Sequence, residues 1–398
     1  MKTNIGVFFG GRSTEHEISV ISASQAMNAI DRTLYDITPI YITKGGQWYT
    51  GKALMDVSNY RDVPALLRRC TPVYMRPIYG DTALYTNASS MFGIKVKKVT
   101  TLDVIIPVLH GANGEDGSFQ GILQAIGIPY AGCDVLASAN GMDKITMKMI
   151  LRACDIPVVD YTWFTDQKWA SEPDAVIAQV EKVLSYPVIV KPADLGSSVG
   201  IARADNREAL AEKITEAAKY STRLIVEHLV EQLKEINCSV LGTCDDYHMS
   251  VLEEPIKTGE ILSYTDKYMG GSKGAKGMQA SAKRIPAELD EGITKRIQFL
   301  AGETFRVLSC HGVARVDLII DDANGSIYVN EINTIPGSLS FYLWEASGIT
   351  FSELMSQLVS LALRRARHQS QKIVSYDQNI FALGGGTKGA KGAKGTKS

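Results

Sequence analysis

Residues 312–337, GVARVDLIIDDANGSIYVNEINTIPG, constrain the fold more than any other part of the chain. The segment holds two runs of β-branched and apolar residues, separated by DDANGS with its Asn-Gly pair. Such a pattern predicts a β-hairpin. Because strand side chains alternate between faces, Arg315 and Asp317 share a face of the first strand, and Glu331 and Asn333 share a face of the second.

Two carboxylates and an amide oxygen on one hairpin form an all-oxygen ligand set of the kind that Mg²⁺ prefers. Arg315 would add a fixed positive charge beside them. A surface hairpin with solvated acidic side chains would show the same residues. The hairpin alone therefore leaves a metal site and an ordinary surface hairpin both open.

The composition excludes several classes of protein. A chain of 398 residues suggests two or three domains, and 42 Lys and Arg against 43 Asp and Glu leave no global charge for nucleic acid. The 6 cysteines are scattered without a CxxC pair, which argues against a zinc site or a disulfide framework. With no signal-peptide pattern and no run of ~20 apolar residues, we expect a cytoplasmic protein without membrane insertion.

The N-terminal third predicts two strands that each end in a glycine-rich turn. Residues 5–9 form a short apolar run entering Gly-Gly, and residues 104–109 form a continuous apolar run entering HGANGEDGSFQG. Strand ends of this kind bind ligands in α/β sheets, so Glu15 and His110 are candidates. Each residue alone is more often structural, and the absence of GxGxxG argues against an NAD site.

Helix signals follow these turns and recur later in the chain. Thr14 and Glu17 have capping-box spacing, which predicts the start of the first helix at Thr14. Apolar periodicity predicts further helices at residues 118–126, 143–151, 287–307 and 351–367. Residues 263–277 are rich in Gly and Lys and predict a loop, and the tail from residue 384 is of low complexity and predicted to be disordered.

The middle of the chain carries a candidate phosphate loop. The strand YPVIVKP is followed by ADLGSSVG and directly by another strand, so backbone N–H groups could surround a phosphate beside Lys191. A plain Gly-Ser hairpin is the alternative, and the segment is not a Walker A loop. The strand at residues 224–227 and Glu235 could hold adenine and ribose, or be an ordinary strand pair.

In this order the motifs resemble one family. A glycine-rich strand–turn–helix with Glu15, then HGANGEDG, KPADLGSSVG, LIVEH with a later Glu, a DKY loop and RVD…EINTIPG occur together in the D-alanine–D-alanine ligases of the ATP-grasp superfamily. The resemblance covers about residues 1–375. It implies an α/β fold, α+β in its central and C-terminal parts, with a three-domain ATP-grasp architecture. The implied units are an N-terminal substrate-binding domain at 1–138, a central subdomain at 139–225, a C-terminal subdomain with the metal site at 226–380, and a disordered Gly/Lys tail at 381–398.

The resemblance also implies an ATP site and two Mg²⁺ (or Mn²⁺) ions. The residues implied to bind ATP are Lys144, Lys191, Ser197, Ser198, Glu227, His228, Val230, Glu235 and Lys267. Of these, Lys144 and Lys191 would bind phosphates, Glu227 with the backbone from His228 to Val230 would hold adenine, and Glu235 would bind the ribose. The residues implied to hold metal are Asp317, Glu331 and Asn333.

The implied reaction is ATP-dependent ligation of two D-alanines through an acyl phosphate, which would provide D-alanyl-D-alanine for peptidoglycan. The implied catalytic residues are Glu15, Ser197, Tyr268, Arg315 and Gly337. Glu15 would bind the ammonium of the first D-alanine, and Arg315 with the Gly337 N–H would form the oxyanion site. The implied substrate-binding residues are His110 for the first carboxylate, and Ser338 or Ser340 for the second.

The acceptor stays open, because SLSFYLWEASGI follows the glycine of NTIPG where the family usually has a serine a few residues on. D-Serine, D-lactate or another amino acid are alternatives, although Tyr268 favours D-alanine over D-lactate. A nucleotide-binding homologue without catalysis is a further alternative. The partners implied are small molecules and, through the N-terminal domain, a second copy of the chain in a homodimer.

Overall fold

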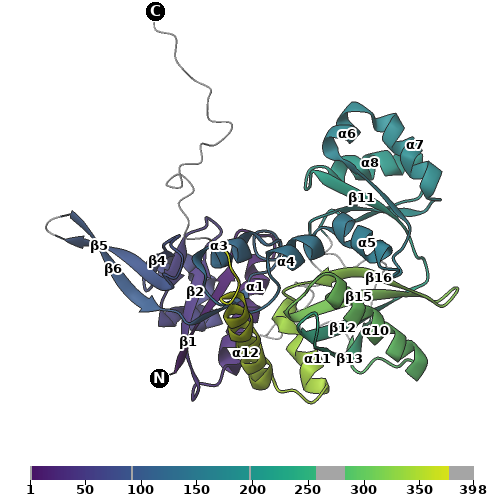
Figure 1. Ribbon diagram of the computed structural model, residues 1–398. Coiled ribbons are helices and arrows are strands. Elements are labelled where there is room, and N and C mark those ends of the chain that lie inside the picture. Colours follow the sequence, from purple (N-terminus) through teal and green to yellow (C-terminus); the bar gives the residue numbers. More distant parts are fainter. Residues whose placement is uncertain (1, 91–92, 197–198, 257–282, 376–398) are drawn as a thin grey trace, which may run out of the picture.

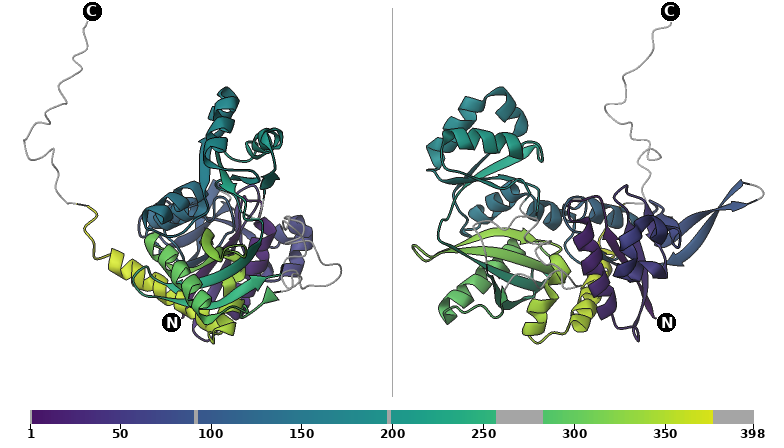
Figure 2. Two further views of the ribbon diagram at one scale, coloured as in Figure 1. Left: turned by 90° about the vertical axis from the view of Figure 1, so that its right-hand side faces the viewer. Right: turned by 180° about the vertical axis from the view of Figure 1, so that it is seen from behind.

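The computed structural model describes residues 2–90, 93–196, 199–256 and 283–375. Within these residues the chain forms three sheets, each with its own helices (Figure 1). The sheet of residues 161–228 and its helices rise away from the other two parts, and the hairpin of residues 83–101 projects at the opposite end (Figure 2). The mixed α/β class predicted from the sequence is confirmed.

The first sheet has the strand order β6-β5-β4-β3-β2-β1-β7. Its strands are β1 (Thr3–Gly10), β2 (Tyr35–Ile42), β3 (Trp48–Thr50), β4 (Thr71–Met75), β5 (Ala83–Ser90), β6 (Gly93–Thr101) and β7 (Val104–Val108). Strand β1, next to the edge strand β7, runs parallel to both β2 and β7, and the remaining neighbours are antiparallel. Because the parallel strands β1 and β7 end at the same edge, the turns that follow them meet there.

The helices of this part are α1 (His16–Ala29), α2 (Val63–Leu67) and α3 (Ser118–Ile126), with the 3-10 helices η1 (Lys52–Met55) and η2 (Val57–Asp62). Helix α4 (Val135–Met142) follows them in the chain, and its buried Ala137 belongs to the core of the third sheet. Helix α3 has the predicted bounds. The predicted capping box at Thr14 is wrong: α1 begins at His16 with Glu15 at the N-cap and no side-chain cap hydrogen bond. The Glu17 carboxylate instead lies 2.6 Å from Lys44 Nζ, so a tertiary ion pair takes the group that the capping box requires.

The second sheet is antiparallel, in the order β10-β9-β11-β8. Its strands are β8 (Tyr161–Thr165), β9 (Val188–Pro192), β10 (Ala202–Ala204) and β11 (Arg223–His228), and its helices are α6 (Asp166–Ser171), α7 (Pro173–Val183) and α8 (Arg207–Ala217). Apolar side chains of α7 and α8 form one core with this sheet. Strand β9 is the predicted strand before the candidate phosphate loop, and β10 follows the loop as expected.

The third sheet has the order β14-β13-β12-β15-β16. Its strands are β12 (Leu233–Gly242), β13 (Tyr247–Pro255), β14 (Lys283–Arg284), β15 (Gly312–Asp321) and β16 (Ser326–Asn333). Strands β15 and β16 are the predicted hairpin. Helices α5 (Lys144–Ala153) and α10 (Glu291–Val307) pack on this sheet, so α5 shares its core although it precedes the second sheet in the chain.

The chain returns to the first sheet after β16. The 3-10 helix η3 (Gly337–Ser340) and helix α11 (Phe341–Ala346) lead to α12 (Phe351–Gln369). Apolar residues of α12, Leu354, Leu358, Leu361 and Ala362 among them, are buried in one core with β1 and β7, and Figure 1 shows α12 beside α1. The predicted divisions at 138/139 and 225/226 fall inside α4 and β11, so the limits of the units stay a proposal. Among the described residues, no helix has the length and apolar character needed to cross a bilayer.

Candidate active site

A cleft opens where the three parts of the molecule meet. The residues that line it come from the turns of the first sheet, from the start of α5 and the loop after β9, and from the end of β16: Glu15, Glu115, Gly141, Met142, Lys144, Leu195, Gly196, Glu331, Ile332, Asn333 and Thr334. Four of the predicted site residues, Glu15, Lys144, Glu331 and Asn333, therefore lie in one cleft. They are separated by up to 318 positions in the sequence.

The hairpin presents its acidic face to this region. Asp317 lies directly across from Glu331, and Arg315 from Asn333. The Arg315 guanidinium donates from Nε and Nη2 to the two oxygens of Asp317 at 2.6 and 2.7 Å, a bidentate pair. Burial raises the pKa of Asp317, although Arg315 opposes the shift. A β-bulge between Asp317 and Leu318 shifts the register next to this pair, as bulges near functional sites commonly do.

Helix α5 delivers Lys144 to the same carboxylates. The Asp143 side chain caps the helix by accepting from the Thr146 N–H at 2.7 Å. Lys144 then extends from the first turn, with its Nζ 2.8 Å from Leu195 O and 3.1 Å from Glu331 Oε2. Burial would lower the pKa of Lys144, but the charge and hydrogen bond of Glu331, together with the charges of Glu227 and Asp194, outweigh it and the pKa is raised. Lys144 is thus a fixed cation between the phosphate-loop candidate and the hairpin.

A second group of buried charges lies behind the cleft. Glu227 on β11 has Lys191 Nζ 2.7 Å from Oε2 and Lys148 Nζ 3.2 Å from Oε1. Lys191 also donates to Asn330 Oδ1 at 3.3 Å, which connects the second sheet to the hairpin. The sequence analysis named Lys191 and Glu227 but missed Lys148. The one feature of the sequence that could have indicated Lys148 is its position four residues after Lys144, on the face of α5 that helical periodicity assigns to the interior.

On the N-terminal side, Glu115 is the residue that the sequence analysis quoted without a role. Its Oε2 accepts from the Gly111 N–H at 2.7 Å and its Oε1 from the Ile335 N–H at 3.0 Å. The carboxyl therefore joins the turn after β7 to the segment after β16. Burial, and next the nearby charge of Glu15, raise the pKa of Glu115 to about 8.

Glu15 lies over two glycines. A side chain at Gly111, where φ is +74°, would place its Cβ 2.8 Å from Glu15 Oε2, and one at Gly196 would place it 3.4 Å from both carboxylate oxygens. Glycine at these two positions therefore lets the turn after β7 and the loop after β9 close around the carboxylate.

His110 is buried in a hydrogen-bond chain. Its Nδ1 lies 2.9 Å from Ile335 O, so Nδ1 carries the proton, and Nε2 accepts from Ser22 Oγ at 2.9 Å. The Ser338 N–H donates to the same Ser22 Oγ at 3.0 Å. Burial lowers the pKa of His110 to about 4, so the ring is neutral at pH 7. The predicted role of His110 at a carboxylate would require exchange of one of these partners.

The segment after the hairpin is held in an unusual backbone conformation. Ser338, Leu339 and Ser340 have φ values of 53°, 52° and 52°, the left-handed region that costs non-glycine residues energy. Ser338 Oγ donates to Gln25 Oε1 on α1 at 2.7 Å, away from the hairpin. The Ser340 hydroxyl is buried and has no hydrogen-bond partner among the residues that the structure describes. Gly337, predicted at the oxyanion, begins this turn.

The remaining predicted site residues fall into two groups. Val230 is buried and His228 exposed at the end of β11, and Glu235 lies on β12 opposite Ile319. This places the predicted adenine and ribose residues at the junction of the second and third sheets. The others lie outside the described residues: Ser197, Ser198, Lys267 and Tyr268.

The donor set on the hairpin is chemically suited to Mg²⁺. It consists of two carboxylates and an amide, Asp317, Glu331 and Asn333, all of which offer oxygen. In the described part of the chain, no cluster of three or more His, Cys, Asp or Glu side chains is arranged as metal ligands, so a metal would need the amide or a substrate oxygen as well. The Asn333 amide now donates from Nδ2 to Asp317 Oδ2 at 3.1 Å, which already places it against the carboxylate.

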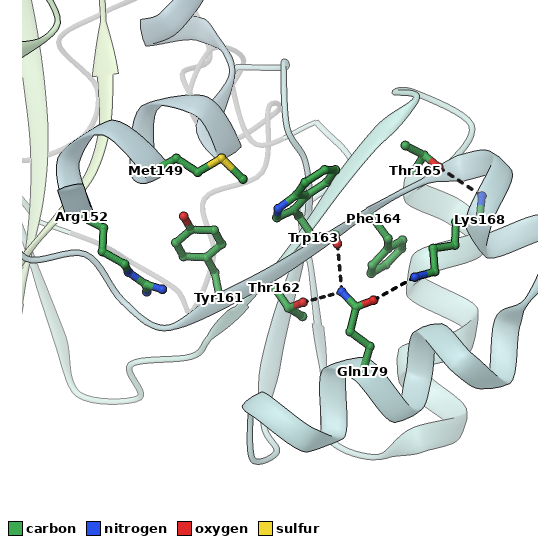
Figure 3. Close-up of a pocket in the computed structure, with 9 residues that line it drawn as sticks. All are labelled: Met149, Arg152, Tyr161, Thr162, Trp163, Phe164, Thr165, Lys168 and Gln179. Carbon is green, nitrogen blue, oxygen red and sulfur yellow. Dashed lines mark hydrogen bonds between the residues drawn. The ribbon is translucent and has the colours of Figure 1, made fainter.

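A larger surface cavity of about 630 Å³ lies along β8, away from these residues (Figure 3). Figure 3 shows Gln179 reaching across it, where its Nε2 donates to Thr162 Oγ1 and Trp163 O, and its Oε1 accepts from Lys168. The side-chain amide of Gln179 thus has its hydrogen-bond partners within the lining of this cavity. None of the predicted site residues lines it.

Two family models match the chain: the N-terminal part of D-ala D-ala ligases over residues 4–133, and the C-terminal part over residues 150–360. A D-alanine–D-alanine ligase of Thermosipho melanesiensis is 39% identical over 380 residues, covering 96% of this chain and 98% of the relative. One of Natranaerobius thermophilus is 38% identical, covering 95% of this chain and 100% of the relative.

Solved structures give the same result. The D-alanine-D-alanine ligase from Coxiella burnetii superposes with a TM-score of 0.75 at 30% identity, covering 93% of this chain and 96% of that one. The VanG D-Ala:D-Ser ligase from Enterococcus faecalis superposes with a TM-score of 0.74 at 31% identity, covering 91% of this chain and 100% of that one. Similarity of this extent in sequence and fold shows that the chain belongs to the D-alanine–D-alanine ligase family and has its three-part ATP-grasp architecture.

Proposed function

We propose that the protein joins two D-alanine molecules at the expense of ATP, by way of an acyl phosphate, and so provides D-alanyl-D-alanine for peptidoglycan. The observation that carries this proposal is the cleft itself. It brings Glu15, Lys144 and Glu331 together, and the loop after β9 in the second part adds Leu195 and Gly196 beside them. A reaction of three substrates needs groups of opposite charge at one place, and this cleft supplies them.

The chemistry follows from the poor reactivity of a carboxylate toward an amine. Transfer of the γ-phosphoryl group to the first carboxylate gives an acyl phosphate, which the amine of the second amino acid can attack. Lys144 and Lys191 are the cations proposed to offset the repulsion between phosphate and carboxylate. Arg315, together with the Gly337 N–H, is the group proposed to stabilise the oxyanion that forms at the acyl carbon.

Glu15 is the group proposed for the ammonium of the first D-alanine. It is buried at the N-terminus of α1, against Gly111 and Gly196. Burial removes water from this carboxylate, which costs free energy. A cationic ligand bound beside it would offset that cost, so the position favours a cationic ligand. The proposed roles of Ser197, Ser198, Lys267 and Tyr268 concern residues outside the described ranges.

Asp317, Glu331 and Asn333 are the residues proposed to hold two Mg²⁺ (or Mn²⁺) ions. When bound, such ions neutralise the charge that develops on the transferred phosphoryl group. The fit rests on the all-oxygen donor set and on the direct pairing of Asp317 with Glu331 across the hairpin.

Phosphate release measured with ATP, Mg²⁺ and one amino acid at a time tests the proposal. D-Alanine should support release, and Glu331→Gln should reduce it at least about 10²-fold with little change in thermal stability. Surface variant Lys182→Met serves as a control that should behave as the wild type. Near-normal turnover of Glu331→Gln would contradict the metal assignment, and silence with every acceptor would leave the non-catalytic nucleotide-binding homologue.

A second candidate is the same chemistry with D-serine, D-lactate or another acceptor. The specific observation in its favour is that a D-Ala:D-Ser ligase matches this fold as well as a D-alanine-D-alanine ligase does. Ser338 and Ser340, predicted to hold the acceptor carboxylate, are buried at the N-terminal part. Release with D-serine but not D-alanine would establish this alternative.

The cytoplasmic location and the homodimer through the N-terminal domain are proposed on the same family relationship. Sedimentation at several protein concentrations measures the assembly state. A monomer at all concentrations would exclude the dimer.

A further inference from the structure

Lys148 is a buried cation without a role in the proposed reaction. It lies on α5, one turn after Lys144, and its side chain is fully enclosed. Its Nζ is 3.2 Å from Glu227 Oε1, yet neither atom makes a hydrogen bond of acceptable geometry with any described residue. Glu227 Oε1 therefore keeps lone pairs that no described donor uses.

Glu227 has two lysine partners, Lys191 and Lys148, and the two lysines differ in exposure and in proposed role. Lys191 contacts Glu227 Oε2 at 2.7 Å, is slightly exposed, and is proposed to bind phosphate. Among the described residues, Glu227 is the carboxylate within ion-pair distance of Lys148, so it is the partner that this charge serves. A buried carboxylate between two buried cations is costly to build, and one lysine would already compensate its charge.

We propose that Lys148 is a positioning residue for base selection: its ion pair with Glu227 Oε1 keeps this carboxylate ionised and fixed, so that the site accepts the 6-amino group of adenine and rejects a 6-oxo purine. The inference rests on the proposed nucleotide site, in which Glu227 lies at the base. An ionised carboxylate can only accept hydrogen bonds. The adenine amino group donates one, whereas the 6-carbonyl of hypoxanthine would face the carboxylate oxygen with another lone pair.

The electrostatics of the site support this geometry. Burial alone would raise the pKa of Glu227, but the charge of Lys148, and then that of Lys191, lowers it to about 2. The other charged or titratable groups that act on this set are Lys144, one turn before Lys148, Tyr161 across the strand pair from Glu227, and Glu331, whose charge acts on Lys148. If Lys148 is replaced by an uncharged residue, Lys191 is the remaining cation that opposes the effect of burial on Glu227. The pKa of Glu227 should therefore rise.

Equilibrium binding of ATP and ITP to the full-length protein tests the inference, because the two nucleotides differ only at the 6-position and the adjacent ring nitrogen. The wild type should bind ATP about 10- to 100-fold more tightly than ITP. This is the range expected when one hydrogen bond to a charged group is lost. Lys148→Met, of similar length but uncharged, should reduce this ratio to less than about threefold, chiefly by weakening ATP binding. Lys148→Arg should restore part of the ratio.

Binding measured between pH 5 and pH 8 gives a second readout that a purely structural lysine would not change. ATP binding of the wild type should stay constant relative to ITP binding, since Glu227 stays ionised throughout. In Lys148→Met the ratio should fall further as the pH is lowered. Lys182→Met on the exposed face of α7 is the matched control, and Lys148→Gln repeats the test should the Met variant not purify in folded form.

The outcomes separate the two proposals. A wild type that binds neither nucleotide contradicts the proposed function. A wild type that prefers ATP, with Lys148 variants that keep the same ratio at every pH, overturns the inference alone and makes Lys148 a structural counter-ion.

Discussion

Replacing Glu115 by Gln removes a buried titratable group while keeping its shape. Glu115 accepts backbone hydrogen bonds from Gly111 and Ile335, and its pKa is raised to about 8 from an ordinary 4.5 by burial and by Glu15. Between these two values the native protein holds a proton that the unfolded chain releases. Stability is therefore greatest below pH 4.5 and is lost as the pH rises toward 8.

The size of the effect follows from the shift. Each pH unit inside the window costs about 1.4 kcal/mol, so the wild type should lose about 4 kcal/mol between pH 5 and pH 8 through this group. At about 2.1 cal/mol/K per residue, that corresponds to about 5 °C in Tm for a chain of this length. In Glu115→Gln the amide nitrogen would face one of the two backbone N–H groups, which adds a destabilisation that does not depend on pH. The variant should lack the additional pH-dependent loss.

Thermal unfolding of both proteins at pH 5, 6, 7 and 8 measures this directly. The difference in Tm between them should shrink by about 5 °C across the series, and all titrations common to both proteins cancel in that difference. Glu212→Gln, at an exposed position, should run parallel to the wild type. Parallel curves for Glu115→Gln as well would refute the reasoning, since they would mean that Glu115 titrates at its ordinary pKa.

Three further substitutions probe the hairpin and its surroundings. Arg315→Lys replaces a bidentate guanidinium with a single donor, and should lower stability by about 1.5–3 kcal/mol in denaturant unfolding and phosphate release by about 10²-fold or more; normal turnover would exclude Arg315 from the oxyanion. Trp344→Phe removes the Nε1–H bond to Ser239 Oγ at 2.9 Å and should cost about 1–2 kcal/mol, with unchanged kcat if this wall is structural. Thr350→Ala removes the capping box of α12 and should cost about 0.5–2 kcal/mol without a change in KM; a specific loss of activity would show that α12 does more than complete the core.

The elements that the sequence predicts well are those whose pattern is local. The β15–β16 hairpin, α3 and α12 each carry a clear apolar period and a turn or cap of their own. In residues 31–100 the sequence predicts a strand at residues 37–41, which lies within β2, but it does not identify the other elements. Strand β6, for example, is exposed along most of its length and so is not the half-buried strand that such patterns describe. The capping box at Thr14 failed for a related reason, since the partner of Glu17 is Lys44 on a different element.

Site residues divide along the same line. Types and spacing indicated Asp317, Glu331 and Arg315, because strand alternation places them on defined faces. Glu115 and Lys148 were missed because their importance depends on burial and on contacts with residues far away in the sequence: Ile335 for one and Glu227 for the other. Nothing within either segment distinguishes such a residue from a solvated charge.

Pairing also changes how the proposed catalytic groups are understood. Arg315 holds both oxygens of Asp317, and Lys144 lies against Glu331, so each carboxylate proposed for metal already has a protein cation. The same two cations are those proposed for the oxyanion and the phosphate. If the carboxylates take a metal, each cation loses part of its attraction to them and becomes available to a new anion. Ion pairs that look like structural features of the hairpin are, on this argument, what keeps its buried charges compensated until substrate provides other partners.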